Sequence, residues 1–174
     1  GISATRIACQ TENLTTKEPD LSFVNRVDSM DSDADVVVVF GGTNDFGHGD
    51  AKLGTFESRD PYTFYGAMHV LCEKLINRFP NADILFMTPL HRCSEDEVSK
   101  ENGLPEETNL AGYVSIIREV AEFYGLPVLD LFSTSGLQPK VDIIKETYMP
   151  DGLHPSDAGA LRIALRLMGF LQTL

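Results

Sequence analysis

Three short runs of apolar residues recur along the chain and predict strands, and the first of them is rich in β-branched side chains. They are residues 35–40 (DVVVVF), 84–87 (ILFM) and 128–132 (VLDLF). Apolar runs without polar alternation are typical of strands that are covered on both faces of a parallel sheet. We therefore expect a buried parallel sheet.

Longer segments place apolar residues at the helical period and predict helices over residues 63–79, 110–124 and about 155–171. The last of these carries Leu161, Leu165, Met168 and Leu171 on one face. Strands that alternate with helices indicate an α/β domain with a central parallel sheet and right-handed crossovers. With 174 residues the chain is long enough for one domain, residues 1–174, and too short for two.

Charge and composition narrow the possible partners. The chain has 14 Lys and Arg against 26 Asp and Glu, a net charge of -12, which argues against nucleic acid because phosphate-binding surfaces need clustered cations. No apolar run approaches the roughly 20 residues of a membrane span, and no signal peptide is visible. We expect a cytoplasmic protein without a membrane partner, although a removed signal stays open, as does the oligomeric state.

The three cysteines, Cys9, Cys72 and Cys93, are odd in number and lack Cys-x-x-Cys spacing. Neither a disulfide framework nor a zinc site finds support in this pattern. We therefore expect free thiols that are buried or partly buried.

The segment Asp151-Gly152-Leu153-His154-Pro155 places a carboxylate and an imidazole three positions apart in a predicted loop. A histidine that acts as a general base needs one ring nitrogen held by a carboxylate and the other free to face a nucleophile. We therefore expect Asp151 and His154 to form a hydrogen-bonded pair. The simpler interpretations are a surface histidine and a carboxylate at a helix entry, and the second is compatible with catalysis.

The segment Gly41-Gly42-Thr43-Asn44-Asp45 follows the first predicted strand directly. Sites in parallel α/β sheets form at the carboxyl ends of strands, so Asn44 lies where a site is expected. Its amide can donate a hydrogen bond to a developing oxyanion, and the alternative is a turn-capping role. For Asp45, a structural role as hydrogen-bond partner of neighbouring loops is at least as well supported as a direct one.

Together these motifs resemble the SGNH/GDSL hydrolase family. Gly42-Thr43-Asn44-Asp45 is similar to its third sequence block and Asp151-x-x-His154 to its fifth. Gly1-Ile2-Ser3-Ala4-Thr5-Arg6 is similar to the second block, which commonly reads Gly-Ile-Ser-Gly-Thr. The resemblance implies a flavodoxin-like three-layer sandwich, a catalytic Asp151 and His154, and oxyanion donors from the Asn44 side chain and the Ala4 backbone N–H. Ala4 departs from the family's glycine, but its N–H can still donate.

The family's first block, Gly-Asp-Ser, carries the nucleophile at the end of a central first strand, and these 174 residues do not contain it. Asp28-Ser29 and Asp31-Ser32 lie in a polar, acidic stretch that we interpret as a loop. We expect an N-terminally truncated domain whose first strand is supplied from elsewhere, because its loss would expose two strand edges and much apolar surface. Descent from an enzyme that lost its serine is the alternative.

Four further residues are candidates for the substrate pocket. Gly42 and Thr43 belong to the motif before Asp45, His48 lies just past Asn44, and His91 follows the end of another predicted strand. Loop histidines are usually solvated, so that alternative stays open for the two histidines. A metal site formed by Asp45, His48, Asp50, Asp151 and His154 lacks any recognised ligand spacing, and an imidazole that serves as a base cannot also be bound to zinc. We expect no metal and no cofactor.

The sequence thus predicts a serine esterase or acylhydrolase that acts on a small-molecule carboxylic ester through an acyl-enzyme. Short acyl esters, acetylated sugars and lysolipids all remain possible substrates. A noncatalytic ligand- or carbohydrate-binding domain on the same scaffold is the alternative from another class. We expect residues 1–174 alone to be inactive, because the nucleophilic serine is missing from them.

Overall fold

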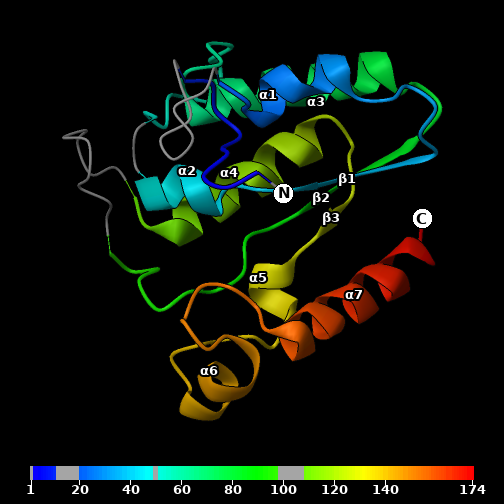
Figure 1. Cartoon of the computed structure of the whole chain (residues 1–174). Helices are drawn as coiled ribbons and strands as arrows, with labels where there is room; N and C mark the ends of the chain where they lie inside the picture. The colour runs from blue at the N-terminus through cyan, green and yellow to red at the C-terminus, as the bar shows by residue number, and fades with distance from the viewer. Residues whose placement is uncertain (1, 11–19, 49–50, 98–107) are drawn as a thin grey trace.

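The computed structural model describes residues 2–10, 20–48, 51–97 and 108–174. Within these residues the centre is a parallel sheet in the order β1 (Val36–Phe40), β2 (Asp83–Met87) and β3 (Val128–Leu129) (Figure 1). Val36 pairs with Asp83 and Phe40 with Met87, so the carboxyl ends of β1 and β2 lie side by side. The α/β class with a parallel sheet is confirmed.

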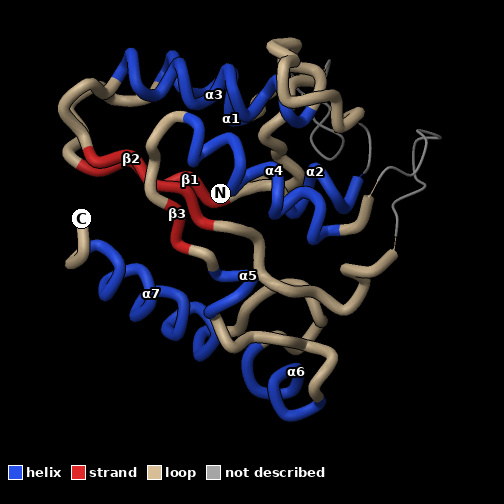
Figure 2. Tube along the Cα trace, turned by 180° about the vertical axis from the view of Figure 1, so that it is seen from behind, coloured by secondary structure: helices blue, strands red, loops and turns tan. Residues whose placement is uncertain are grey.

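Helices lie on both sides of the sheet (Figure 2). One side carries α1 (Phe23–Arg26), the 3-10 helix η1 (Val27–Ser29), α2 (Thr43–His48), α3 (Phe64–Arg78) and α4 (Leu110–Phe123); α5 (Leu131–Thr134), α6 (Asp142–Tyr148) and α7 (Asp157–Leu171) lie towards the other. Alternate residues of β2 belong to two apolar cores: Ile84 and Phe86 pack in the larger one and Leu85 and Met87 in the smaller. None of the described helices is long and apolar enough to span a membrane.

The three predicted helices are confirmed to within two residues as α3, α4 and α7. Hydroxyl caps fix two of the starts, because Thr63 Oγ1 accepts from the Gly66 N–H and Ser156 Oγ from the Gly159 N–H. The third strand is shorter than predicted. The Asp130 carboxylate accepts the Ser133 N–H and caps α5, so the chain turns into a helix at Leu131.

β1 is covered on one face only among the described residues, so the prediction of a strand buried on both faces is wrong for it. Val37 and Val39 are buried, whereas Val36, Val38 and Phe40 are 43%, 39% and 42% exposed. The described part of the chain also pairs β1 with β2 alone, which leaves its other edge open.

Helix α7 is also covered on one face only among the described residues, and the predicted apolar face is not the covered one. Its buried residues are Gly159 and Ile163, while Leu161, Leu165 and Met168 of the predicted apolar face are exposed. The acidic stretch before β1 also differs from the prediction, because Asp28 and Ser29 belong to η1 rather than to a loop.

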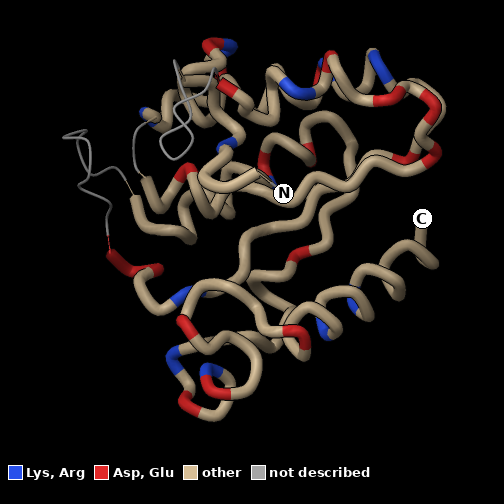
Figure 3. Tube along the Cα trace, viewed as in Figure 1, with Lys and Arg blue, Asp and Glu red and all other residues tan. Residues whose placement is uncertain are grey.

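Charged residues of both signs are interspersed over the helices and loops (Figure 3). Among the charged residues, Arg6, Asp45 and Glu95 are buried. Burying a carboxylate is costly unless donors compensate for lost water, so Asp45 and Glu95 need hydrogen-bond partners.

Candidate active site

The loop between α6 and α7 pairs Asp151 with His154. His154 Nδ1 lies 2.7 Å from Asp151 Oδ2, while Asp151 Oδ1 accepts hydrogen bonds from the backbone N–H groups of Leu153 at 2.9 Å and His154 at 2.7 Å. Gly152 has a φ of 76°, a left-handed conformation that glycine adopts without strain and that turns the loop back. The predicted pairing of Asp151 with His154 is confirmed.

The electrostatics of this pair suit a general base. The hydrogen bond from His154 and the two backbone N–H donors lower the pKa of Asp151 to about 2. An ionised Asp151 favours the tautomer with the proton on Nδ1 of His154, which leaves Nε2 as the basic nitrogen. The His154 side chain is 75% exposed, so a reacting group can reach it.

Asn44 lies in the first turn of α2, directly after β1. Its Nδ2 donates to the backbone oxygen of Thr5 at 2.9 Å. Asn44 and His154 both line a cavity of about 160 Å³, whose walls also include Phe40, Leu90 and Leu153. The fold therefore brings together two motifs that lie far apart in the sequence.

The segment around Ala4 is fastened to α2. Ala4 is buried and has a φ of 56°, a left-handed conformation that favours glycine, the residue usual at this position of the resembling family. The next residue, Thr5, accepts the Asn44 amide. Ala4 is not among the residues that line the cavity, so its role as an oxyanion donor stays a prediction.

The Asp45 carboxylate links α2 to this segment by hydrogen bonds. Its carboxylate accepts the Ile7 N–H at 3.1 and 3.0 Å and the Ala8 N–H at 2.9 Å. Complete burial raises the pKa of Asp45 to about 6, although the N–H donors of Ala8 and Ile7 and the charge of Arg6 oppose the rise. The structural alternative considered for Asp45 agrees with these contacts.

We expect Asp45→Asn to change the pH dependence of stability. The raised pKa means that, between about pH 4 and pH 6, folded Asp45 holds a proton that the unfolded chain has released, so its contribution to stability falls as pH rises through that window. The free energy of unfolding of wild type minus that of Asp45→Asn should decrease by about 2 kcal/mol from pH 4 to pH 6.5. Urea titrations across this range measure it, and a constant difference would contradict the prediction.

Of the four other residues predicted to line the substrate pocket, one lines the cavity beside Asn44 and His154. Thr43 lines the cavity, whereas Gly42, His48 and His91 are not among its lining residues. Gly42 is buried with a φ of 99°, and His48 is the last residue of α2. The His91 ring stacks on Phe132 with ring centroids 3.9 Å apart. Substrate contact by these residues stays a prediction.

Sequence reasoning missed the loop that follows β2. Arg92 Nη1 donates to the Thr43 oxygen at 3.3 Å, and the Cys93 N–H donates to the Gly152 oxygen at 2.9 Å. These contacts join loops that are distant in sequence, and no local motif signals them. The stretch 94–108, which the sequence predicts to be a loop, falls partly outside the described residues.

The cysteines are free, with Cys9 and Cys72 buried and Cys93 exposed. Burial raises the pKa of the Cys72 thiol to about 12, so it stays protonated. Over the described ranges, no three His, Cys, Asp or Glu side chains gather in a way that could hold a metal ion.

Comparison with known proteins identifies the family. Residues 3–162 match the GDSL-like lipase/acylhydrolase family, which is nearly the whole chain. The chain belongs to this family. GDSL-like acylhydrolases hydrolyse carboxylic esters, so an imidazole–carboxylate pair beside a cavity agrees with the family's chemistry. No curated protein matches the sequence.

Solved structures agree with the GDSL-like assignment. One crystal structure is 39% identical over 98% of this chain and 76% of its own, with a TM-score of 0.82. A Lactobacillus plantarum protein is 31% identical over 99% of this chain and 79% of its own, with a TM-score of 0.85. An acetyl xylan esterase, 20% identical over 97% of this chain and 77% of its own, has a TM-score of 0.61 and shares the fold.

Proposed function

We propose that this GDSL-like protein is a serine esterase that hydrolyses short-chain acyl esters through an acyl-enzyme. The observation that carries the proposal is that His154, which is hydrogen-bonded to Asp151, lines the same cavity as Asn44. In this mechanism His154 Nε2 takes the proton from the attacking serine hydroxyl and gives it to the leaving alcohol. Water then attacks the acyl-enzyme through the same histidine, which releases the acid and restores the serine.

Each remaining group has a role in this scheme. Asp151 orients the ring of His154 and stabilises the imidazolium that forms. The Asn44 amide and the backbone N–H of Ala4 donate to the oxyanion of the tetrahedral intermediate. One N–H of the Asn44 amide is used by Thr5, and an amide has two, so the other is available for the oxyanion.

The lining of the cavity supports an acyl group as its occupant, because the apolar side chains of Phe40, Leu90 and Leu153 lie beside Asn44 and His154. The fold shared with an acetyl xylan esterase makes an acetylated sugar the first substrate to test.

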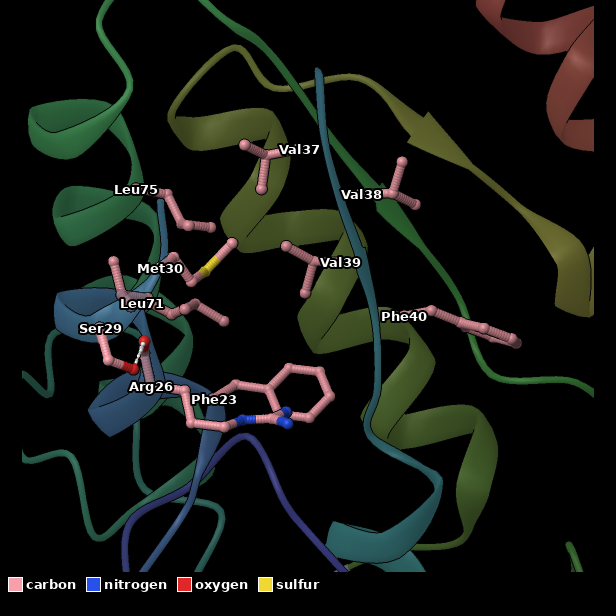
Figure 4. Close-up of a pocket in the computed structure, with 11 residues that line it drawn as sticks. Phe23, Arg26, Ser29, Met30, Val37, Val38, Val39, Phe40, Leu71 and Leu75 are labelled. Carbon is pink, nitrogen blue, oxygen red and sulfur yellow. Dashed lines mark hydrogen bonds between the residues drawn. The ribbon is translucent and has the colours of Figure 1, made fainter. Parts of the chain in front are cut away.

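We further propose that the nucleophile comes from a Gly-Asp-Ser segment, outside residues 1–174, on a strand that pairs with the open edge of β1. An apolar groove of about 430 Å³ follows this edge and supports the proposal. In Figure 4, Phe23, Met30, Leu71 and Leu75 lie across the groove from Val37 and Val39. A strand parallel to β1 would end beside Asn44, because the carboxyl ends of parallel strands meet at one edge of the sheet.

The test compares residues 1–174 with a longer chain that includes a Gly-Asp-Ser segment. We expect the longer chain to hydrolyse p-nitrophenyl acetate and butyrate faster than the octanoate, and residues 1–174 alone to show no meaningful turnover. The Ser→Ala variant of the longer chain is the control, because loss of a triad member leaves only a small residual rate.

Each other outcome has a definite meaning. Full turnover by residues 1–174 alone would place the nucleophile within them, and Ser3 would be the first residue to replace. No turnover by either chain would contradict the esterase proposal. Binding of an acetylated sugar without turnover would favour the noncatalytic binding domain.

A further inference from the structure

Two consecutive residues after β2 contact both halves of the candidate site. Arg92 Nη1 donates to the backbone oxygen of Thr43, the residue before Asn44. The Cys93 N–H donates to the backbone oxygen of Gly152, inside the loop that pairs Asp151 with His154. Arg92 and Cys93 therefore link the segment that carries the amide donor to the loop that carries the general base.

Helix α2 needs external support to hold Asn44 in place. It has six residues, and so short a helix is not stable by its own hydrogen bonds. Asp45 fastens it to the N–H groups of Ile7 and Ala8. Arg92 is a separate tie, which donates to Thr43 and lies over the Phe46 ring with 5.2 Å from the guanidinium carbon to the ring centroid.

The fit of Arg92 against α2 is close. A Cβ at Gly47 would lie 2.9 Å from Arg92 Nη1, so the glycine leaves the space that the guanidinium occupies. The Arg92 side chain is half-buried, and its Nε donates to Ser94 Oγ at 3.1 Å. These contacts hold the guanidinium against α2.

Glu95 holds the backbone of Arg92 by a hydrogen bond. Its Oε2 accepts the Arg92 N–H at 3.2 Å and lies 2.6 Å from His91 Nδ1, while its Oε1 is 3.0 Å from both Gln138 Nε2 and Lys140 Nζ. Burial acts to raise the pKa of Glu95, but these donors outweigh it and hold the pKa below its ordinary value. Glu95 is therefore ionised at neutral pH, and the loop that carries Arg92 and Cys93 is held from several sides.

We propose that Arg92 is a positioning residue. By holding Thr43 in place, it keeps the neighbouring Asn44 amide within hydrogen-bonding distance of the oxyanion that forms beside His154. The inference rests on the proposed esterase function. An oxyanion donor works only at about 2.7–3.1 Å from the developing charge, and a misplacement of about 1 Å can cost on the order of 100-fold in rate. Arg92 does not line the cavity, so its loss should lower kcat and leave KM nearly unchanged.

The first measurement compares Arg92→Met, Arg92→Lys and Arg162→Met in the complete enzyme. Arg162 is a matched control, because its Nη1 donates to the Gly136 oxygen at 3.1 Å and it lies over the Tyr148 ring, and neither contact reaches Thr43. We expect Arg92→Met to lower kcat about 10- to 100-fold with KM within about twofold. Arg92→Lys should recover much of the loss because it keeps a donor, and Arg162→Met should stay near wild type.

The second measurement is a double-mutant cycle with Asn44→Ala, which separates positioning from general destabilisation. If Arg92 acts through Asn44, Arg92→Met should cost less than about threefold once Asn44 is alanine. The same fold loss in both backgrounds, or no loss in the Arg92→Met single variant, would overturn the inference. If Arg92→Met does not fold, the cycle is run with Arg92→Lys, whose smaller loss must vanish in the same way.

The cycle also distinguishes failure of the inference from failure of the proposed function. A large loss in Asn44→Ala with no loss in the Arg92 variants would overturn the positioning role alone. No loss in Asn44→Ala itself would remove the oxyanion role of Asn44, and the inference would fall with it.

Discussion

Replacement of His154 by alanine is expected to lower kcat of the complete enzyme by at least about 10⁴-fold, because no other group in the proposed mechanism can take the serine proton. The fold should be unaffected. The His154 side chain is 75% exposed, and surface substitutions usually change stability by less than about 0.5 kcal/mol. Steady-state hydrolysis of p-nitrophenyl acetate, with thermal melts of both proteins, measures the two effects separately.

Asp151→Asn extends this test to the other member of the pair. An asparagine keeps the size of the side chain but removes the charge that favours the Nδ1-protonated tautomer, so a loss of about 10³- to 10⁴-fold is expected. Asp157→Asn is the control, because Asp157 is an exposed carboxylate in the first turn of α7, close in sequence. Activity near wild type in His154→Ala would mean that another group is the base.

Asn44→Ala is expected to lower kcat by about 10²- to 10³-fold with little change in KM, because an oxyanion donor acts mainly in the transition state. The substitution also removes the hydrogen bond to the Thr5 oxygen, so stability must be measured as well. Asn77→Ala is the control, because Asn77 Nδ2 also donates to a backbone oxygen, that of Glu73, in α3. A loss that appears mainly in KM would indicate that Asn44 binds substrate without stabilising the oxyanion.

These tests concern groups that the sequence could predict, because their signals are local. The pair of Asp151 and His154 needs only four consecutive residues and a glycine that can turn the loop. The helices α3 and α7 follow from apolar spacing and a hydroxyl cap a few residues away, which short-range physics specifies. The position of Asn44 at the carboxyl end of a strand follows from the direction of a parallel sheet.

Other features depend on contacts that no local pattern contains. The end of β3 was predicted too late, because the apolar residues Leu131 and Phe132 suit either a strand or a helix, and the Asp130 cap decides for the helix. The valines of β1 predict a strand but not which of its faces is covered, since that depends on which elements pack against it. An acidic residue such as Glu95 is expected at the surface from the sequence. In the structure it is buried, because Gln138 and Lys140 donate hydrogen bonds to it.

The sequence by itself therefore determined the α/β class, the main helices and the Asp151–His154 pair, since each follows from residue patterns along continuous stretches of the chain. Only the tertiary structure decided that Asn44 shares a cavity with His154, that Asp45 is buried against Ile7 and Ala8, and that Arg92 and Cys93 join the two motifs. The physical reason is that these contacts form between residues whose separation along the chain is large, and chain folding alone brings such residues to hydrogen-bonding distance.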